Sequence, residues 1–177
     1  MKPPRLADEA VLLRPWREED MPAVTAAFQD PLIPRFIRTV PTPYRKSDAE
    51  EWFAGLDTAE SLNLAITGVE SDVVLGGVSL LRFDWENKRA EIGLWVAAEA
   101  RGRGIATRAV TLLSRWGLES LGLARIDFLA EEENAASQRV AERAGFEREG
   151  VLRAYFDNRG TRPDYVMFSL LPSDLAP

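Results

Sequence analysis

A segment rich in glycine and arginine, Arg101-Gly102-Arg103-Gly104-Ile105-Ala106, carries the residues best suited to hold an anion. It follows a strand-like run over residues 89–96 and opens a helix-like run from 105 to about 120. Glycine lets the backbone bend closely around a ligand, and the first N–H groups of a helix have no intrahelical acceptor. Those donors and the positive end of the helix dipole favour a phosphate. The segment is predicted to bind a phosphate; the alternative is a tight connection with solvated arginines.

Two common nucleotide-binding motifs do not fit this segment. A P-loop requires a Gly-Lys-Ser/Thr sequence that is absent, and a dinucleotide fingerprint requires a third glycine where Thr107 stands. The predicted phosphate therefore belongs to another class of ligand.

A second polar pair, Asn134 and Ser137, lies one predicted strand further along the chain. Residues three apart share a face of a helix, and asparagine is a favoured N-cap. Both side chains can therefore face a ligand at the start of a helix over 135–144. In the alternative interpretation, Asn134 only caps that helix and Ser137 is exposed.

The composition excludes several kinds of chemistry. The sequence has no cysteine and no histidine, which excludes a disulfide, a thiol nucleophile, Cys- or His-ligated metal and a Ser-His-Asp triad. Proton transfer must then fall to carboxylates, Tyr, Lys, Ser or water. The net charge of −6 argues against a nucleic-acid partner and is compatible with a cationic substrate such as an amine.

Length and hydropathy predict one domain spanning residues 1–177, with 46% hydrophobic and 28% charged residues. No apolar run approaches the roughly 18 residues that span a bilayer. The first residues have no apolar signal core, so we expect a cytoplasmic protein without a membrane partner.

The patterning predicts the elements that position these residues. The expected strands are 11–15, 62–69, 74–85, 89–96, 125–130, 146–157 and 162–171, and the expected helices are 18–28, 47–56, 105–120 and 135–144. Ser47 and Glu50 have the spacing of a capping box, and Asn158-Arg159-Gly160 predicts a tight hairpin between the last two strands. The residues 30–42, with three prolines, should form a loop with short helical pieces. This order predicts an α/β fold with a mixed sheet and one β-α-β crossover at the glycine segment.

Together these segments resemble the GNAT superfamily of N-acetyltransferases. The acetyl-CoA loop of that family reads Gln/Arg-x-x-Gly-x-Gly/Ala, and Arg101, Gly104 and Ala106 fall on its three defined positions. A later family segment matches Asn134 and the pair Gly145-Phe146. The stretches 13–16, 146–153 and 164–170 resemble the branch that acetylates ribosomal-protein alanine N-termini.

The resemblance implies a single-domain GNAT-like fold with a central mixed, mostly antiparallel sheet flanked by helices. It implies acetyl-CoA as the co-substrate, with no metal. The pantetheine arm would lie between two splayed parallel strands, at Trp95-Val96 and residues 125–130, and would also contact Asn134. The pyrophosphate would sit on the N–H groups of residues 101–106, with the Arg101 and Arg103 side chains adding charge.

The resemblance also implies direct attack of a neutral amine on the thioester, without a covalent enzyme intermediate. Glu91 is the candidate base; the alternative is a surface carboxylate paired with Arg89 or Lys88. Many family members place a tyrosine acid seven residues after the motif asparagine, where this chain has Ala141. Ser137 is therefore the candidate partner of the departing thiolate. Tyr155 is a reserve acid, with packing in a strand as its alternative role.

The acceptor implied by the family is a primary amine, either a peptide N-terminus or a small molecule. The proline-rich segment 30–43 is expected to form part of its wall, and a homodimer is possible. Because the usual tyrosine is missing, an acyl-CoA-binding sensor or degenerate acetyltransferase without turnover stays open as the alternative.

Overall fold

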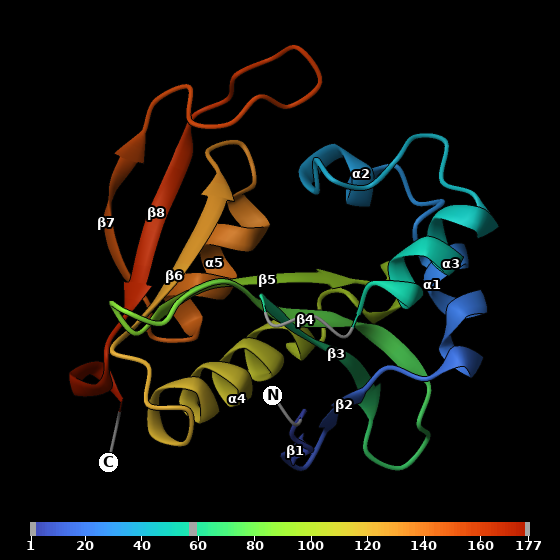
Figure 1. Ribbon diagram of the computed structural model, residues 1–177, viewed down its shortest axis with the longest axis horizontal. Helices are drawn as coiled ribbons and strands as arrows, with labels where there is room; N and C mark the ends of the chain where they lie inside the picture. Colours follow the sequence, from blue (N-terminus) through green and yellow to red (C-terminus); the bar gives the residue numbers. More distant parts are fainter. Residues whose placement is uncertain (1–2, 57–59, 176–177) are drawn as a thin grey trace.

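The computed structural model describes residues 3–56 and 60–175, which form one eight-stranded mixed sheet with helices on both faces (Figure 1). The strands are β1 (Leu6–Ala7), β2 (Val11–Pro15), β3 (Ser61–Gly68), β4 (Val74–Asp84), β5 (Arg89–Val96), β6 (Arg125–Glu131), β7 (Glu147–Leu152) and β8 (Tyr165–Leu170). The helices are α1 (Met21–Ala27), α2 (Leu32–Phe36), α3 (Lys46–Ala54), α4 (Ile105–Glu119) and α5 (Ala135–Arg143). Short 3₁₀ turns cover Glu18–Asp20, Ala98–Ala100 and Pro172–Asp174.

The sheet order is β1-β2-β3-β4-β5-β6-β8-β7. Among the described strands, β5 and β6 form the one parallel pair, because α4 carries the chain back between them. The predicted α/β class, the mostly antiparallel sheet and the single crossover are confirmed.

The main core lies between the sheet and α4. This helix buries an apolar stripe that includes Ile105, Ala109 and Leu113 against inward residues of the sheet such as Ile92 and Phe128. The other face of β5 is therefore left to form a site.

A second apolar cluster holds α1, α2 and α3 together on that other face. Phe28, Ile33 and Tyr44 are buried in it, and Trp95 of β5 packs against it. The Phe28 and Trp95 rings meet edge to face at 4.9 Å between centroids. The helical N-terminal region is thus fixed over the part of β5 that precedes the 101–106 loop.

The strands β5 and β6 separate partway along their length. Their pairing runs from Arg89↔Arg125 to Ile92↔Phe128 and then stops, although β5 continues to Val96 and β6 to Glu131. Each strand stays bonded to its other neighbour, since Val96 pairs with Gly76 of β4 and Glu131 pairs with Tyr165 of β8. The expected splay is therefore present.

Two details of the sequence prediction are wrong. The capping box lies two residues earlier than expected, because α3 begins at Lys46 and the Asp48 carboxylate accepts the Arg45 N–H at 2.6 Å. The last two strands are shorter than expected, since β7 ends at Leu152 and β8 begins at Tyr165. The intervening residues 153–164 form a loop.

The 153–164 loop leaves the sheet because its tip bonds to α2 and to the segment that follows α2. The Asn158 amide donates to the Arg35 carbonyl at 3.2 Å, and the Arg159 guanidinium donates to the carbonyls of Pro34 and Val40. In Figure 1 the loop arches from the top of β8 towards α2. Within residues 3–56 and 60–175, no helix has the length and apolarity needed to cross a membrane.

Candidate active site

A cleft of about 580 Å³ opens where β5 and β6 separate. It is lined by β5, the end of β6, the start of α5 and the segment from α2 to α3. Four of the residues predicted for the site line it together: Glu91, Trp95, Asn134 and Ser137. Residues 36–41, part of the segment expected to form the acceptor wall, also contribute to the lining.

The 101–106 loop lies beyond the carboxyl end of β5 and outside the cleft lining. Val96, the last residue of β5, is also absent from the lining. Gly102 and Gly104 have φ angles of +73° and +77°, and no heavy atom lies within 4 Å of a Cβ built on either residue. Within the described part of the chain, the N–H groups of residues 102–107 have no hydrogen-bond acceptor. The loop is therefore open, positively polarised and unsatisfied, as an anion site requires.

The Arg101 side chain is already engaged. Its guanidinium lies 2.5 Å from the Asp30 carboxylate and donates from Nε to the Val96 carbonyl at 3.1 Å. The Leu32 N–H and Arg101 hold the pKa of Asp30 below its ordinary value. Arg101 thus links the 101–106 loop to the α1–α2 connection. Among the described residues, the exposed Arg103 has no ion-pair partner.

Asn134 both caps α5 and faces the cleft. Its Oδ1 accepts the Ser137 N–H at 3.1 Å, which confirms the predicted N-cap. The side-chain nitrogen of Asn134 and the Ser137 hydroxyl have no hydrogen-bond partner in the described part of the chain. Both groups are therefore available to a ligand in the cleft.

Glu91 is paired with Arg82, a partner that the sequence prediction did not include. The Arg82 Nε donates to Glu91 Oε2 at 3.0 Å, and a second guanidinium nitrogen bonds Oε1. Arg89, the expected partner, pairs with Asp84 instead. The Glu91 side chain is 17% exposed, so it is a half-buried carboxylate at the cleft and not a solvated one.

A β-bulge explains this pairing. The β4–β5 register shifts between Leu81 and Asp84, so that Arg82 and Phe83 together oppose Ala90. The bulge residue Arg82 has a φ of +52°, which turns its side chain to the face that carries Glu91.

Three functional candidates escaped the sequence prediction: Glu131, Asn158 and Tyr165. Glu131 is 8% exposed at the end of β6; its Oε1 accepts from the Asn158 amide at 2.9 Å and faces the Tyr165 hydroxyl at 3.4 Å. Burial, and then the Glu131 charge, raise the pKa of Tyr165 to about 12, so its phenol stays protonated at neutral pH. The Glu131↔Tyr165 pairing depends on the β6–β8 register, which local sequence does not show.

Tyr165 and Tyr44 line the cleft, and Tyr155, the reserve acid of the sequence analysis, does not. Tyr155 lies in the 153–164 loop, is 46% exposed and does not line the cleft. Its alternative role, packing in a strand, is also wrong because β7 ends three residues before it. Among the described residues, no group of three or more Asp or Glu side chains is arranged to hold a metal ion.

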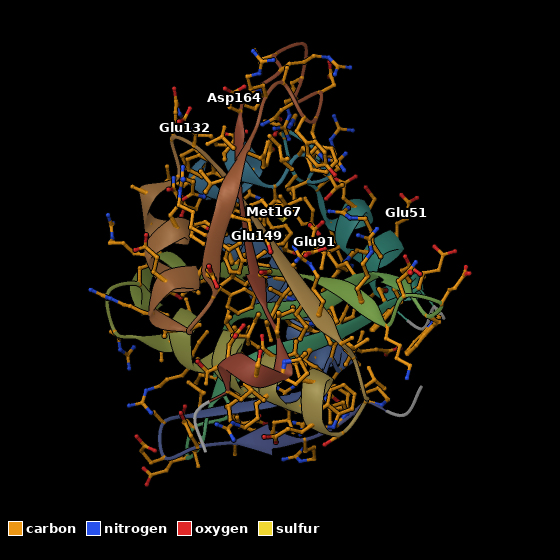
Figure 2. The ribbon with its side chains drawn as sticks, turned by 90° about the vertical axis from the view of Figure 1, so that its left-hand side faces the viewer. Glu51, Glu91, Glu132, Glu149, Asp164 and Met167 are labelled. Atoms are coloured by element: carbon orange, nitrogen blue, oxygen red, sulfur yellow. The ribbon has the colours of Figure 1, made fainter. Side chains whose placement is uncertain are left out.

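Carboxylates dominate the charged lining of the cleft. Figure 2 places Glu91 near the middle of the molecule and Glu51 on α3 beyond it. Asp48, Glu51, Glu91 and Glu131 contribute to the lining, against Arg38 and Arg82. The arrangement can bind a positively charged amine beside the strand gap.

Known proteins share both the sequence and the fold. Residues 10–147 match the family described as the acetyltransferase (GNAT) domain. The chain is 32% identical to the uncharacterized N-acetyltransferase p20 of Bacillus licheniformis, over 97% of this chain and 98% of that protein. It is 37% identical to the putative ribosomal N-acetyltransferase YdaF of Bacillus subtilis, over 60% of this chain and 61% of that protein.

The fold agrees with that of a solved structure, Mycobacterium smegmatis RimJ in complex with CoA-disulfide. The TM-score is 0.90 at 21% identity, with 99% of this chain and 90% of that chain covered. At this identity the likeness concerns the fold alone. Since the family match spans most of the sequence and p20 aligns almost end to end, the chain belongs to the GNAT acetyltransferase family and is an N-acetyltransferase.

Proposed function

We propose that this chain transfers the acetyl group of acetyl-CoA to a primary amine by direct attack. The observation that supports this best is the strand gap between β5 and β6, with Glu91 on one strand and Ser137 on the helix that follows the other. The open N–H groups of residues 102–107 lie beyond the end of β5, where the donor's phosphates would bind.

Two sets of protein groups bind acetyl-CoA, one for its pyrophosphate and one for its pantetheine arm. The backbone N–H groups of residues 102–107 hold the pyrophosphate, whereas the expected Arg101 N–H is already bonded to the Ala98 carbonyl at 3.3 Å; Arg103 adds charge to that end. The free edges of β5 beyond Ile92 and of β6 beyond Phe128 leave strand N–H and C=O groups for the pantetheine arm. The Asn134 amide nitrogen offers one more donor to the arm.

The reaction then needs two proton transfers. An amine arrives largely as ammonium, because its reference pKa is about 7.7–8.0 for an α-amine and about 10.4 for lysine. Glu91, directly or through water, takes the proton, and the neutral nitrogen attacks the thioester carbonyl. The C–N bond forms as the C–S bond breaks, and the nitrogen gives up a second proton as it becomes an amide. That proton, carried by water, neutralises the departing thiolate, which accepts a hydrogen bond from the Ser137 hydroxyl until then.

The acceptor binds in the carboxylate-lined cleft under α2 and the 153–164 loop. A peptide N-terminus and a small-molecule amine both carry the positive charge that this lining favours. The similarity to the putative ribosomal acetyltransferase YdaF supports the peptide class as one of the two.

A thiol-release assay with acetyl-CoA tests the proposal against N-terminal peptides, diamines and aminoglycosides. We expect release with at least one amine class, and we expect Glu91→Gln to lower kcat by roughly 10²–10⁴-fold near neutral pH without changing CoA affinity. Glu86→Gln is the matched control, because Glu86 is exposed in the β4–β5 turn.

Two results would contradict the proposal. Tight CoA binding without release of thiol for any amine would indicate a sensor that does not turn over. Unchanged turnover of Glu91→Gln with a true acceptor would remove Glu91 from the mechanism.

A further inference from the structure

The cleft contains a second carboxylate, Glu131, whose surroundings differ from those of Glu91. Both oxygens of Glu91 accept N–H bonds from Arg82, so its charge is already balanced. Glu131 is more than nine-tenths buried and, within residues 3–56 and 60–175, has no cationic partner. A buried carboxylate without a counter-charge is costly unless a ligand supplies one.

The side chain of Glu131 is held with one oxygen left free. Oε1 is occupied by two neutral donors, the Asn158 amide at 2.9 Å and the Tyr165 hydroxyl at 3.4 Å. Oε2 has no hydrogen-bond partner in the described chain. It does not belong to the fully buried polar atoms without a partner, so solvent can reach it. Because Glu131 lines the cleft, this oxygen is open to a molecule bound there.

The strand register separates Glu131 from Glu91. Glu91 pairs with Asp127, and Glu131 lies four residues further along β6 on the same face. At about 3.3 Å per residue the two positions are about 13 Å apart along the strands. The splay begins between them, after Ile92 and Phe128. An amine positioned for Glu91 at the gap therefore leaves Glu131 free for a different group.

We propose that Glu131 binds a second positively charged group of the acceptor, several ångströms from the nitrogen that is acetylated. This inference rests on the proposed function and narrows its acceptor to amines that carry a second cation. The chemistry is a charge-assisted hydrogen bond from an ammonium or guanidinium to Oε2. Asn158 and Tyr165 are positioning residues, because both donate to Oε1 of Glu131 and leave Oε2 for the ligand.

The remaining charges of the cleft agree with a dicationic acceptor. Asp48 and Glu51 add two carboxylates on α3. Arg82 is taken by Glu91, and the Arg38 guanidinium lies 4.4 Å from the centroid of the Phe156 ring. Among the described residues, neither arginine forms an ion pair or hydrogen bond with Glu131, although the Arg38 charge reaches the neighbouring Tyr165 hydroxyl.

The first test compares acceptors that differ only in the second charge, with the wild-type protein. One pair is 1,5-diaminopentane and n-hexylamine; the other is alanyl-lysine amide and alanyl-norleucine amide. We expect kcat/KM for the charged member of at least one pair to be about 10- to 100-fold higher, as for a hydrogen bond to a charged group. The pair that responds identifies a small-molecule or a peptide source.

The second test changes Glu131. Glu131→Gln keeps both neutral donors in reach but removes the charge, so we expect it to abolish the preference through KM while leaving CoA affinity unchanged. Glu131→Asp keeps the charge and should retain part of the preference. Glu132→Gln is the matched control, because Glu132 is exposed and lies at the edge of the molecule in Figure 2.

Several outcomes would overturn the inference. If the wild-type protein shows equal kcat/KM for the two members of each acceptor pair, the inference is wrong. This result needs no variant, so it holds even if Glu131→Gln fails to fold. A preference that survives in folded Glu131→Gln, or that Glu132→Gln also loses, would overturn the inference as well. These results differ from a failure of the proposed function, in which no amine releases thiol at all.

Discussion

At the scale of single residues, one hydrogen bond in the first turn of α5 separates the structural role of Asn134 from the proposed chemical role of Ser137. The Asn134 Oδ1 caps the helix by accepting the Ser137 backbone N–H at 3.1 Å, which fixes the Asn134 side chain at the cleft. The Ser137 hydroxyl has no hydrogen-bond partner among the described residues, so the fold does not depend on it, and its proposed role toward the thiolate can be tested separately. Its removal should affect chemistry more than stability.

Ser137→Ala should lower kcat by about one to two orders of magnitude, because the departing thiolate loses its hydrogen-bond donor. CoA affinity and thermal stability should change little, since the capping bond comes from the backbone N–H. Ser137→Thr retains a hydroxyl and should recover part of the rate. Steady-state kinetics with a working acceptor measures this, and an unaltered kcat in Ser137→Ala would assign the thiolate to another donor.

At the scale of elements, the two ends of α4 differ in their free hydrogen-bond donors, and we propose that the start of the helix binds the phosphates. Gly104 is the left-handed N-cap at φ +77°, followed by N–H groups without acceptors. Gly122, just beyond the end of α4, has a similar φ of +75° and equally open surroundings. A substitution at either glycine would introduce similar backbone strain, but only Gly104 lies beside the free N–H groups of residues 102–107.

Gly104→Val and Gly122→Val form a matched pair. Each places a side chain in the left-handed region, which should cost roughly 1–2 kcal/mol of unfolding free energy. Gly104→Val should also reduce CoA affinity by more than tenfold, because the bent backbone and its N–H groups can no longer surround the pyrophosphate. Calorimetric titration with CoA separates the effects, and equal CoA affinities in the two variants would contradict the assigned role of the loop.

At the scale of the whole molecule, an ion pair connects two strands that are not neighbours in the sheet. Arg125 on β6 donates to both oxygens of Glu149 on β7, at 2.6 and 2.7 Å, and so reaches across β8. Ser169 of β8 adds a hydrogen bond to the same carboxylate at 2.6 Å. The Arg125 and Ser169 bonds lower the pKa of Glu149 from 4.5 to about 2.

This pKa shift predicts how stability depends on pH. A carboxyl group with a lowered pKa in the folded state stabilises the fold above its unfolded pKa, and the contribution is lost as pH falls from about 4.5 to about 2. Glu149→Gln should therefore lower Tm at pH 7 by a few degrees at most, because the Glu149 side chain is 40% exposed. The difference from wild type should shrink between pH 5 and pH 2.

Thermal unfolding at several pH values measures this difference. Glu147→Gln is the control, because Glu147 is exposed in the same strand. A gap between Glu149→Gln and wild type that stays constant with pH would contradict the ion pair as its source.

The sequence by itself determined the features that depend on neighbouring residues. The glycines at 102 and 104, the alternation of β5 and the Asn134 cap each act within a few positions. The open glycine loop, the element types and the pair Asn134–Ser137 could therefore be predicted. The family pattern added Glu91, and the structure places it at the cleft.

Only the tertiary structure decided which charges face the cleft and with which partners. A bulge in β4 brings Arg82 to Glu91, and pairing of β6 with β8 sets Glu131 beside Tyr165. Asn158 bonds to Glu131 at a separation of 27 positions, and Arg159 bonds to Pro34 at 125. Strand register and loop contacts between distant residues decide which charged side chains meet at the cleft, and a local sequence pattern does not predict them.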